Sequence, residues 1–400
     1  MTELPLLRQS ERAAFKRCQW AWYQSYVLGL QPIIEKHMEL AEFGTLVHVC
    51  LAEYYLPGIQ RGPHPAETWQ RVAGEVRTKV RTEASNDDEL VAKWEDFYTL
   101  GTELLVAYEL QYQGDPHWDV IDAERRFSVL IPDVRVPRLK SAKGRRVYTP
   151  IVRLVGTIDL CFRDLNQEDN KHRPLVKMVD HKTMTRIETA HLTLDEQPST
   201  YIAVGTHALQ AQGLIEKDQV IAGMEWNIIK RAKLDTRPRD ERGMARNKPT
   251  KKHYIDALTS CLDTDYVESD RTDLMKWKLD ALEHEALLYC GPVYGDVSAD
   301  QSGQNFLRYF VPRTAKERQR QIVRISEEAR VMDDVRAGRL PVLKTPTHQC
   351  PYCKYFDLCE LDESGGDVDY FIETTMKKHD PYEDHREGAS NSKFLPKDGG

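Results

Sequence analysis

The sequence PLVKMVDHKTM, residues 174–184, begins as an apolar strand and ends in three polar residues, Asp180, His181 and Lys182. Strands usually fill buried positions with β-branched or aromatic residues. Burying a charge is costly unless the charge is paired or bound to a metal ion. This stretch is therefore either a strand that simply reaches solvent or a strand whose terminal charges act together.

A second acid, Asp159, interrupts the apolar strand RLVGTIDLCF upstream. Side chains alternate along a strand, so Asp180 and Lys182 share one face and His181 points to the other. If residues 164–174 form a hairpin connection, Asp159 can join Asp180 and Lys182. Two close carboxylates need a cation between them, and their oxygen ligands favour Mg²⁺ or Mn²⁺. A nearby lysine suits metal-assisted phosphodiester hydrolysis, although a lone D…DxK pattern also arises by chance.

Two predicted helices flank these strands. FGTLVHVCLAEYY carries His48 among apolar residues, and QPSTY places Gln197 and Tyr201 four residues apart on one helix face. Each has an ordinary explanation, since a lone histidine is usually a satisfied core residue. Gln197 and Tyr201 also fit a helix N-terminus followed by an interfacial tyrosine.

The order of these motifs is more specific than any one of them. A helix with GxxxH, a strand with GxxD, a strand with DxK and a helix with QxxxY follow one another. This order resembles the RecB-type branch of the PD-(D/E)XK nuclease superfamily, which includes the CRISPR-adaptation nucleases. The resemblance covers residues 10–235 and the cysteine region.

The resemblance implies a role for each motif residue. The metal ligands would be His48, Asp159, Asp180 and the backbone carbonyl of His181. Lys182 would be the catalytic lysine, and Gln197 and Tyr201 would position the DNA backbone or that lysine. Such proteins often carry an acid at the place of Glu124. The His181 position departs from the usual motif, where an apolar or small polar residue is commoner.

Three cysteines, Cys350, Cys353 and Cys359, cluster in CPYCKYFDLC. Thiolates favour zinc or an iron–sulfur cluster, and either centre prefers four ligands. The resemblance supplies the fourth as Cys18, because similar nucleases staple their first and last segments with a [4Fe–4S] cluster. Zinc, or no metal, are the alternatives. The remaining cysteines are predicted to be core residues: Cys50, Cys161, Cys261 and Cys290.

The bulk composition predicts a globular protein. Hydrophobic residues make up 40% and charged residues 30% of the 400 positions, and no apolar run reaches the ~18 residues of a membrane span. No signal peptide pattern is visible, so we expect a reducing cytoplasm, bacterial or phage-infected. The net charge of −7 argues against a generally basic surface. The basic clusters at 134–148 and 230–253 are either solvated loops or a local groove for nucleic acid.

The succession of patterns predicts an α/β fold, with a PD-(D/E)XK restriction-endonuclease-like core sheet flanked by helices. We expect strands at 118–131, 148–164, 174–183 and 220–231 and helices at 10–30, 41–56, 62–84, 89–113, 194–213, 270–290 and 314–338. The predicted domains are an N-terminal helical region with Cys18 and His48 (1–116), a nuclease core (117–235), a helical and basic accessory region (236–345), a cysteine segment (346–362) and a mostly disordered tail (363–400).

The leading hypothesis is a Mg²⁺- or Mn²⁺-dependent DNA exonuclease with an iron–sulfur cluster. Single-stranded ends are the expected substrate, in phage or bacterial recombination or repair, with a helicase or recombinase as partner. The alternative is a non-catalytic DNA-binding or partner module whose cluster, or zinc, is structural. No nucleotide-binding glycine loop is present, so ATP hydrolysis is not indicated.

Overall fold

The computed structural model describes residues 4–33, 38–83, 87–136, 139–140, 146–147, 149–261, 271–299 and 305–385. The chain folds into two compact units, one formed by Met1–Arg231 with Phe306–Gly400 and the other by Ala232–Asn305. The second unit overlaps the first part of the predicted accessory region and begins slightly before it, at Ala232. Residues 306–345 of that region belong instead to the first unit, because they add a strand and a helix to its core.

The first unit is built on one mixed sheet. Its strands follow the order β1 (Leu6–Leu7), β6 (Pro150–Glu168), β7 (Pro174–Met184), β8 (Ile221–Lys230) and β9 (Phe306–Pro312), and β3 (Trp118–Pro132) also pairs with β6. Neighbouring strands are antiparallel at β3–β6, β6–β7 and β8–β9, whereas β7 and β8 are parallel. A short separate hairpin pairs β4 (Leu139–Lys140) with β5 (Arg146–Val147).

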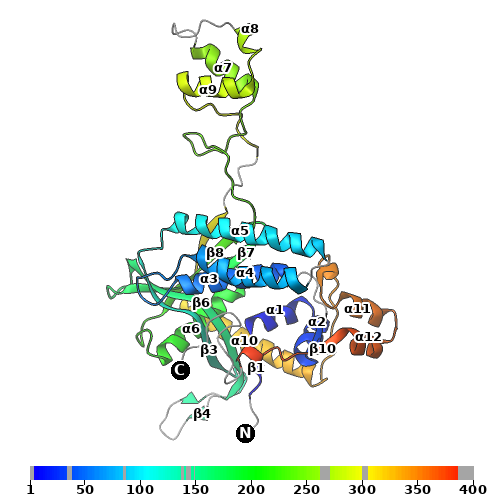
Figure 1. The fold of residues 1–400 in the computed structure, drawn as a ribbon. Coiled ribbons are helices and arrows are strands. Elements are labelled where there is room, and N and C mark those ends of the chain that lie inside the picture. The colour runs from blue at the N-terminus through cyan, green and yellow to red at the C-terminus, as the bar shows by residue number, and fades with distance from the viewer. Residues whose placement is uncertain are drawn as a thin grey trace. The chain divides into compact units, whose positions relative to one another are not determined.

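Helices cover both faces of this sheet. Figure 1 shows α3 (Met38–Tyr54), α4 (Pro65–Glu83) and α5 (Asp88–Tyr112) grouped on one side, with α6 (Glu196–Ala211) and α10 (Ala315–Arg336) on the other. The crossover helix α6 packs tightly at Gly205, where an added Cβ would lie 3.2–3.4 Å from Met178, Ile221 and Ile158. This central sheet flanked by helices confirms the predicted fold class.

The helix α3 is held between the sheet and two other helices. Its Gly44 lies against β7, and an added Cβ there would be 3.0 Å from Thr183 Oγ1. On its other side, Phe43 contacts the rings of Trp69 in α4 and Phe97 in α5, with centroid distances of 5.0 and 5.5 Å. Gly101 of α5 leaves room for the Trp69 ring. This packing fixes how α3 presents its residues to the sheet.

The N-terminal and C-terminal segments of the first unit pack together. The early elements are α1 (Gln9–Arg17), α2 (Gln19–Trp22), a π-helical turn (Tyr23–Val27) and β2 (Leu30–Pro32), and the late ones are a 3₁₀ turn (Cys350–Tyr352), α11 (Phe356–Glu363), α12 (Val368–Thr375), β10 (Met376–Lys378) and a second 3₁₀ turn (Glu383–His385). Strand β10 pairs antiparallel with β2.

The prediction of a mostly disordered tail is wrong for residues 368–385. Phe371, Ile372 and Met376 pack with Leu30 and Leu358 in a small core. Composition averaged over the polar tail conceals this short apolar group. Residues 386–400 of the predicted tail lie outside the described residues.

The second unit has its own small core. It contains α7 (Lys251–Cys261), α8 (Arg271–Leu274) and α9 (Leu279–Tyr289), whose buried residues include Leu258, Leu274 and Leu282. Cys261 and Cys290 are joined by a disulfide, with Cα atoms 6.3 Å apart. The prediction that both are core residues is wrong, because both are half-buried and the packing of α7 against α9 brings them together in this disulfide. Cys50 and Cys161 are buried, as predicted.

Among the helices that the structure describes, each is too short or too polar to cross a membrane.

Two glycine substitutions test the packing that supports α3. Gly101→Ala should lower the free energy of unfolding by about 1–2 kcal/mol, because a Cβ there overlaps the Trp69 ring and overpacking outweighs the gain in helix propensity. Gly74→Ala in α4 is the matched control, since its Cβ would meet only Tyr98 at 3.8 Å. It should raise stability by about 0.5–1 kcal/mol. Chemical denaturation measures both, and equal effects of the two variants would contradict this packing.

Candidate metal centre

Three side chains from three different elements converge at one point. His48 comes from α3, Glu124 from β3 and Asp159 from β6, and their potential ligand atoms all lie within 4.8 Å of one another. His48 Nδ1 is 3.4 Å from Asp159 Oδ2 and 3.6 Å from Glu124 Oε1. The His48 side chain is 29% exposed and that of Glu124 20%, so solvent reaches the cluster.

The backbone of β3 has an unusual conformation at Glu124. The neighbouring register pairs Ala123–Leu160 and Arg125–Ile158 place Glu124 at the level of Asp159. Its φ angle is 47°, in the left-handed region that side chains other than glycine rarely adopt. Such conformations concentrate at functional sites. Glu124 was predicted only from the resemblance, as a place where such proteins often carry an acid, because its strand holds several other charged residues.

The end of β7 lies against this cluster. The His181 backbone N–H donates to Asp159 Oδ2 at 2.8 Å, and His48 Nε2 lies 2.9 Å from the His181 carbonyl oxygen. Lys182 Nζ is 2.8 Å from Asp180 Oδ2. The structure therefore brings together the four predicted ligand residues and the predicted catalytic lysine.

The helix α6 adds the other two predicted residues. Gln197 Nε2 donates a hydrogen bond to Asp180 Oδ1. The helix begins at an N-cap, Asp195, whose side chain accepts the backbone N–H of Gln197 at 2.7 Å. Tyr201 packs edge-on against Phe127, and burial together with the nearby Asp180 and Asp159 charges raises the pKa of its hydroxyl. Gln197 thus contacts a predicted ligand, and Tyr201 lies beside the acids.

Burial and mutual repulsion disfavour ionisation of the two aspartates at the centre. Burial raises the pKa of Asp180 to about 6, with Asp159 adding to the shift and Lys182 opposing it. Burial also raises the pKa of Asp159, and Glu124 adds to this against the effect of His48. For His48, burial lowers the pKa, but Asp159 and Glu124 outweigh burial and raise it to about 9. Negative charge is thus in excess at the centre.

This donor set fits a divalent cation. Two carboxylates and one imidazole nitrogen converge, and the Asp180 carboxylate lies near enough to feel the Asp159 charge. A cation would relieve the repulsion that raises the pKa values of the acids. Carboxylates suit Mg²⁺ and Mn²⁺, and the imidazole adds a ligand that transition metals accept. His48, Glu124, Asp159 and Asp180 are the residues that could hold it.

Two of the predicted cluster cysteines that are far apart in the chain, Cys18 and Cys359, lie near each other. Cys18 lies between α1 and α2, Cys350 begins the 3₁₀ turn, Cys353 follows it and Cys359 is in α11; all four are unpaired and half-buried. Burial raises the pKa of Cys359, and the Cys18 and Cys353 thiolates contribute to that shift. The Trp20 backbone N–H donates to Leu343 O at 3.0 Å, joining the segments that carry them. Four thiols suit either zinc or an iron–sulfur centre.

Removing one acid should stabilise the metal-free protein in a pH-dependent way. Asp180 has its pKa raised from 3.8 to about 6 on folding, so its ionisation costs stability as pH rises through that window. Asp180→Asn in EDTA should therefore melt above the wild type at pH 8, with little difference near pH 3.5. The gain should grow mainly between pH 4 and 6. Melting curves across this range measure it, and a gain that shrank with rising pH would contradict the assigned charge.

The comparison with known proteins identifies the family. No curated protein matches the chain closely enough to count as a relative. The model of one protein family, described as the PD-(D/E)XK nuclease superfamily, matches residues 9–360. This match spans the three strands that carry the acids, the helices that carry His48 and Gln197, and the cysteine segment. The chain therefore belongs to the PD-(D/E)XK nuclease superfamily.

Proposed function

We propose that this chain is a Mg²⁺- or Mn²⁺-dependent DNA exonuclease of the RecB type that acts on single-stranded ends. The observation that carries the proposal is the convergence of His48, Glu124 and Asp159 within 4.8 Å, beside the Asp180–Lys182 pair. The superfamily supports metal-dependent nuclease activity. The choice of DNA ends rests on the resemblance to the histidine-bearing branch, which is mostly exonucleolytic. The proposed setting, phage or bacterial recombination or repair with a helicase or recombinase partner, rests on the same resemblance.

The protein's own groups have separable tasks in hydrolysis. The reaction joins a water oxygen to phosphorus and breaks one phosphorus–oxygen ester bond. A bound divalent cation supplies positive charge for the phosphate and lowers the pKa of water. Asp180 holds the Lys182 ammonium at 2.8 Å, where its charge can stabilise the developing negative charge on phosphate. The Gln197 amide fixes Asp180 from its other oxygen, so the carboxylate cannot rotate freely.

The cysteine segment is proposed to hold a [4Fe–4S] cluster through Cys18, Cys350, Cys353 and Cys359. Four unpaired thiols on two segments that already pack together support this assignment. A cluster bound there would link residues far apart in the sequence, and constraining so long a loop reduces the entropy of the unfolded chain. The cluster is structural in this proposal, because its cysteines are on elements other than those that carry the acids.

Nuclease activity is tested with end-labelled single-stranded DNA and Mn²⁺ or Mg²⁺. The wild-type protein should release labelled nucleotides from an end, and Asp180→Ala should reduce the rate by at least about 100-fold, since it removes a metal ligand and the partner of Lys182. Asp369→Ala, in the distant helix α12, is a control that should keep full activity. If wild type and Asp180→Ala both bind DNA and leave it intact, the protein is a non-catalytic binding module.

Iron content tests the cluster without reference to activity. Anaerobically purified wild-type protein should contain about four irons per chain, and Cys18→Ser should lose most of them because one ligand is missing. Cys161→Ala, at a buried cysteine of β6, should retain the iron. Stoichiometric zinc in place of iron would assign the site to zinc instead.

A further inference from the structure

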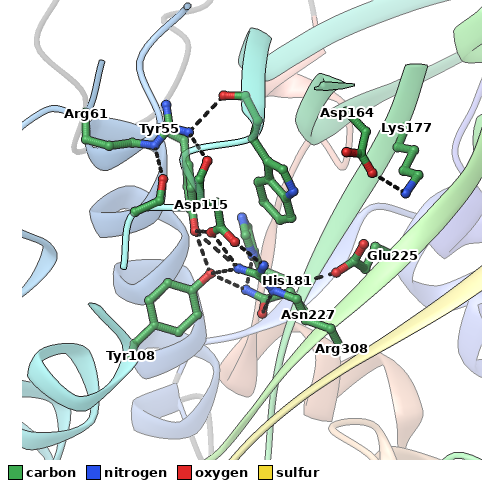
Figure 2. A network of polar contacts seen from close by, with 12 residues as sticks. Tyr55, Arg61, Tyr108, Asp115, Asp164, Lys177, His181, Glu225, Asn227 and Arg308 are labelled. Atoms are coloured by element: carbon green, nitrogen blue, oxygen red, sulfur yellow. Dashed lines mark hydrogen bonds and ion pairs between the residues drawn. The ribbon is translucent and has the colours of Figure 1, made fainter. Parts of the chain in front are cut away.

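The side chain of His181 has no part in the function described so far. Its backbone contacts both sides of the centre, since its N–H donates to Asp159 and its carbonyl faces His48 Nε2. Its imidazole is 2% exposed and lies on the other side of β7 from Asp180. There, Asn227 Nδ2 donates a hydrogen bond to His181 Nδ1 at 2.8 Å. Figure 2 shows His181 in a buried polar network that includes Asn227, Arg308 and Asp115.

Arg308 determines which way the Asn227 amide points. The guanidinium Nε faces Asn227 Oδ1 at 3.5 Å, and arginine can only donate. The amide oxygen must therefore face Arg308, which leaves the two amide hydrogens for His181 Nδ1 and for the Tyr108 hydroxyl at 2.9 Å. The His181 Nδ1 atom is then an acceptor, so His181 is the neutral tautomer with its proton on Nε2.

The rest of the network has the same fixed direction. The Tyr55 hydroxyl donates its hydrogen to Asp115 Oδ2 at 2.7 Å. Because that hydrogen is used, the Tyr108 hydroxyl, 3.0 Å from the Tyr55 hydroxyl, must donate to it. The Asp115 carboxylate accepts hydrogen bonds from both terminal nitrogens of Arg308. The Arg308 guanidinium stacks on Tyr112, with its Cζ atom 3.5 Å from the ring centroid. Arg308 can only donate hydrogen bonds and the Asp115 carboxylate can only accept them, so together they fix the direction of the bonds between them. Reversing any bond would leave two donors or two acceptors in contact, which is costly when buried.

We propose that His181 is a positioning residue, and that the network of Asn227, Tyr108, Tyr55, Asp115 and Arg308 holds its imidazole so that the His181 backbone fixes Asp159 and His48 for metal binding. The inference rests on the proposed metal-dependent function and adds to it the hydrogen-bond network that orients the metal ligands Asp159 and His48. Groups that orient metal ligands through hydrogen bonds commonly change metal affinity by about 10–100-fold when removed.

The test is the affinity of metal-free protein for Mn²⁺, measured by calorimetry. Asn227→Leu keeps the side-chain size but removes the donor to His181 Nδ1, so it should weaken Mn²⁺ binding about tenfold or more. Tyr108→Phe is the milder variant, which keeps a packed ring and should weaken binding less. In DNA assays the KM should stay near the wild-type value while kcat falls, because the DNA contacts are unchanged.

The control is a buried polar pair of β6 and β7 that no hydrogen bond among the described residues joins to this network. Lys177 Nζ lies 2.6 Å from Asp164 Oδ2, and Figure 2 shows this pair separate from the network. Asp164→Asn should lower the Tm and leave Mn²⁺ affinity unchanged. The inference is overturned if Asn227→Leu and Tyr108→Phe both bind Mn²⁺ as tightly as the wild type, even with a lower Tm. If the wild type itself binds no Mn²⁺, the proposed metal-dependent function fails and the inference fails with it.

Discussion

Repulsion among closely placed carboxylates is the constraint on which the rest of the structure depends. The Glu124 charge acts on Asp159 and the Asp159 charge acts on Asp180, where burial already disfavours ionisation, so the pKa values of both aspartates are raised. Left to themselves, such groups would separate or become protonated. Hydrogen bonds from the His181 N–H and the Gln197 amide hold the two aspartates in place. Much of the surrounding fold serves to keep these two donors in position.

A buried arginine fixes the turn of α6 that carries Gln197. Arg12 of α1 is fully buried and bonds Glu196 at 2.9 Å, Thr200 at 3.0 Å and Glu328 at 2.7 Å. These contacts connect the first turn of α6 to α1 and α10. Removing one partner from such a group is costly, because a buried charge then lacks compensation. The turn that presents Gln197 is thus fixed by the same means as the strand end that presents the His181 N–H.

The sequence predicted the parts of the site that are local in the chain. The strands carrying Asp159 and Asp180 and the helix carrying Gln197 have clear periodicity, and the motif order indicated their meeting. The network behind His181 could not be predicted, because it joins Tyr55, Tyr108 and Arg308, which only tertiary packing brings together. The Cys261–Cys290 disulfide was missed for the same reason, since spacing alone does not determine pairing. Strand β9, which carries Arg308, was not among the expected strands, although its sequence FLRYFVP is rich in aromatic residues that favour strands.

The position of β9 in the chain has a consequence for how the centre forms. Strand β8 supplies Asn227, but Arg308, which orients Asn227, follows only after the whole second unit, Ala232–Asn305. The first part of the chain can build β3, β6 and β7 and gather the acids, yet it lacks the guanidinium that compensates Asp115 and directs the Asn227 amide. Ordering of the His181 strand end therefore requires chain from both sides of the second unit. The alignment of the acids thus depends on the pairing of β9 with β8, and on residues from both flanks of the second unit.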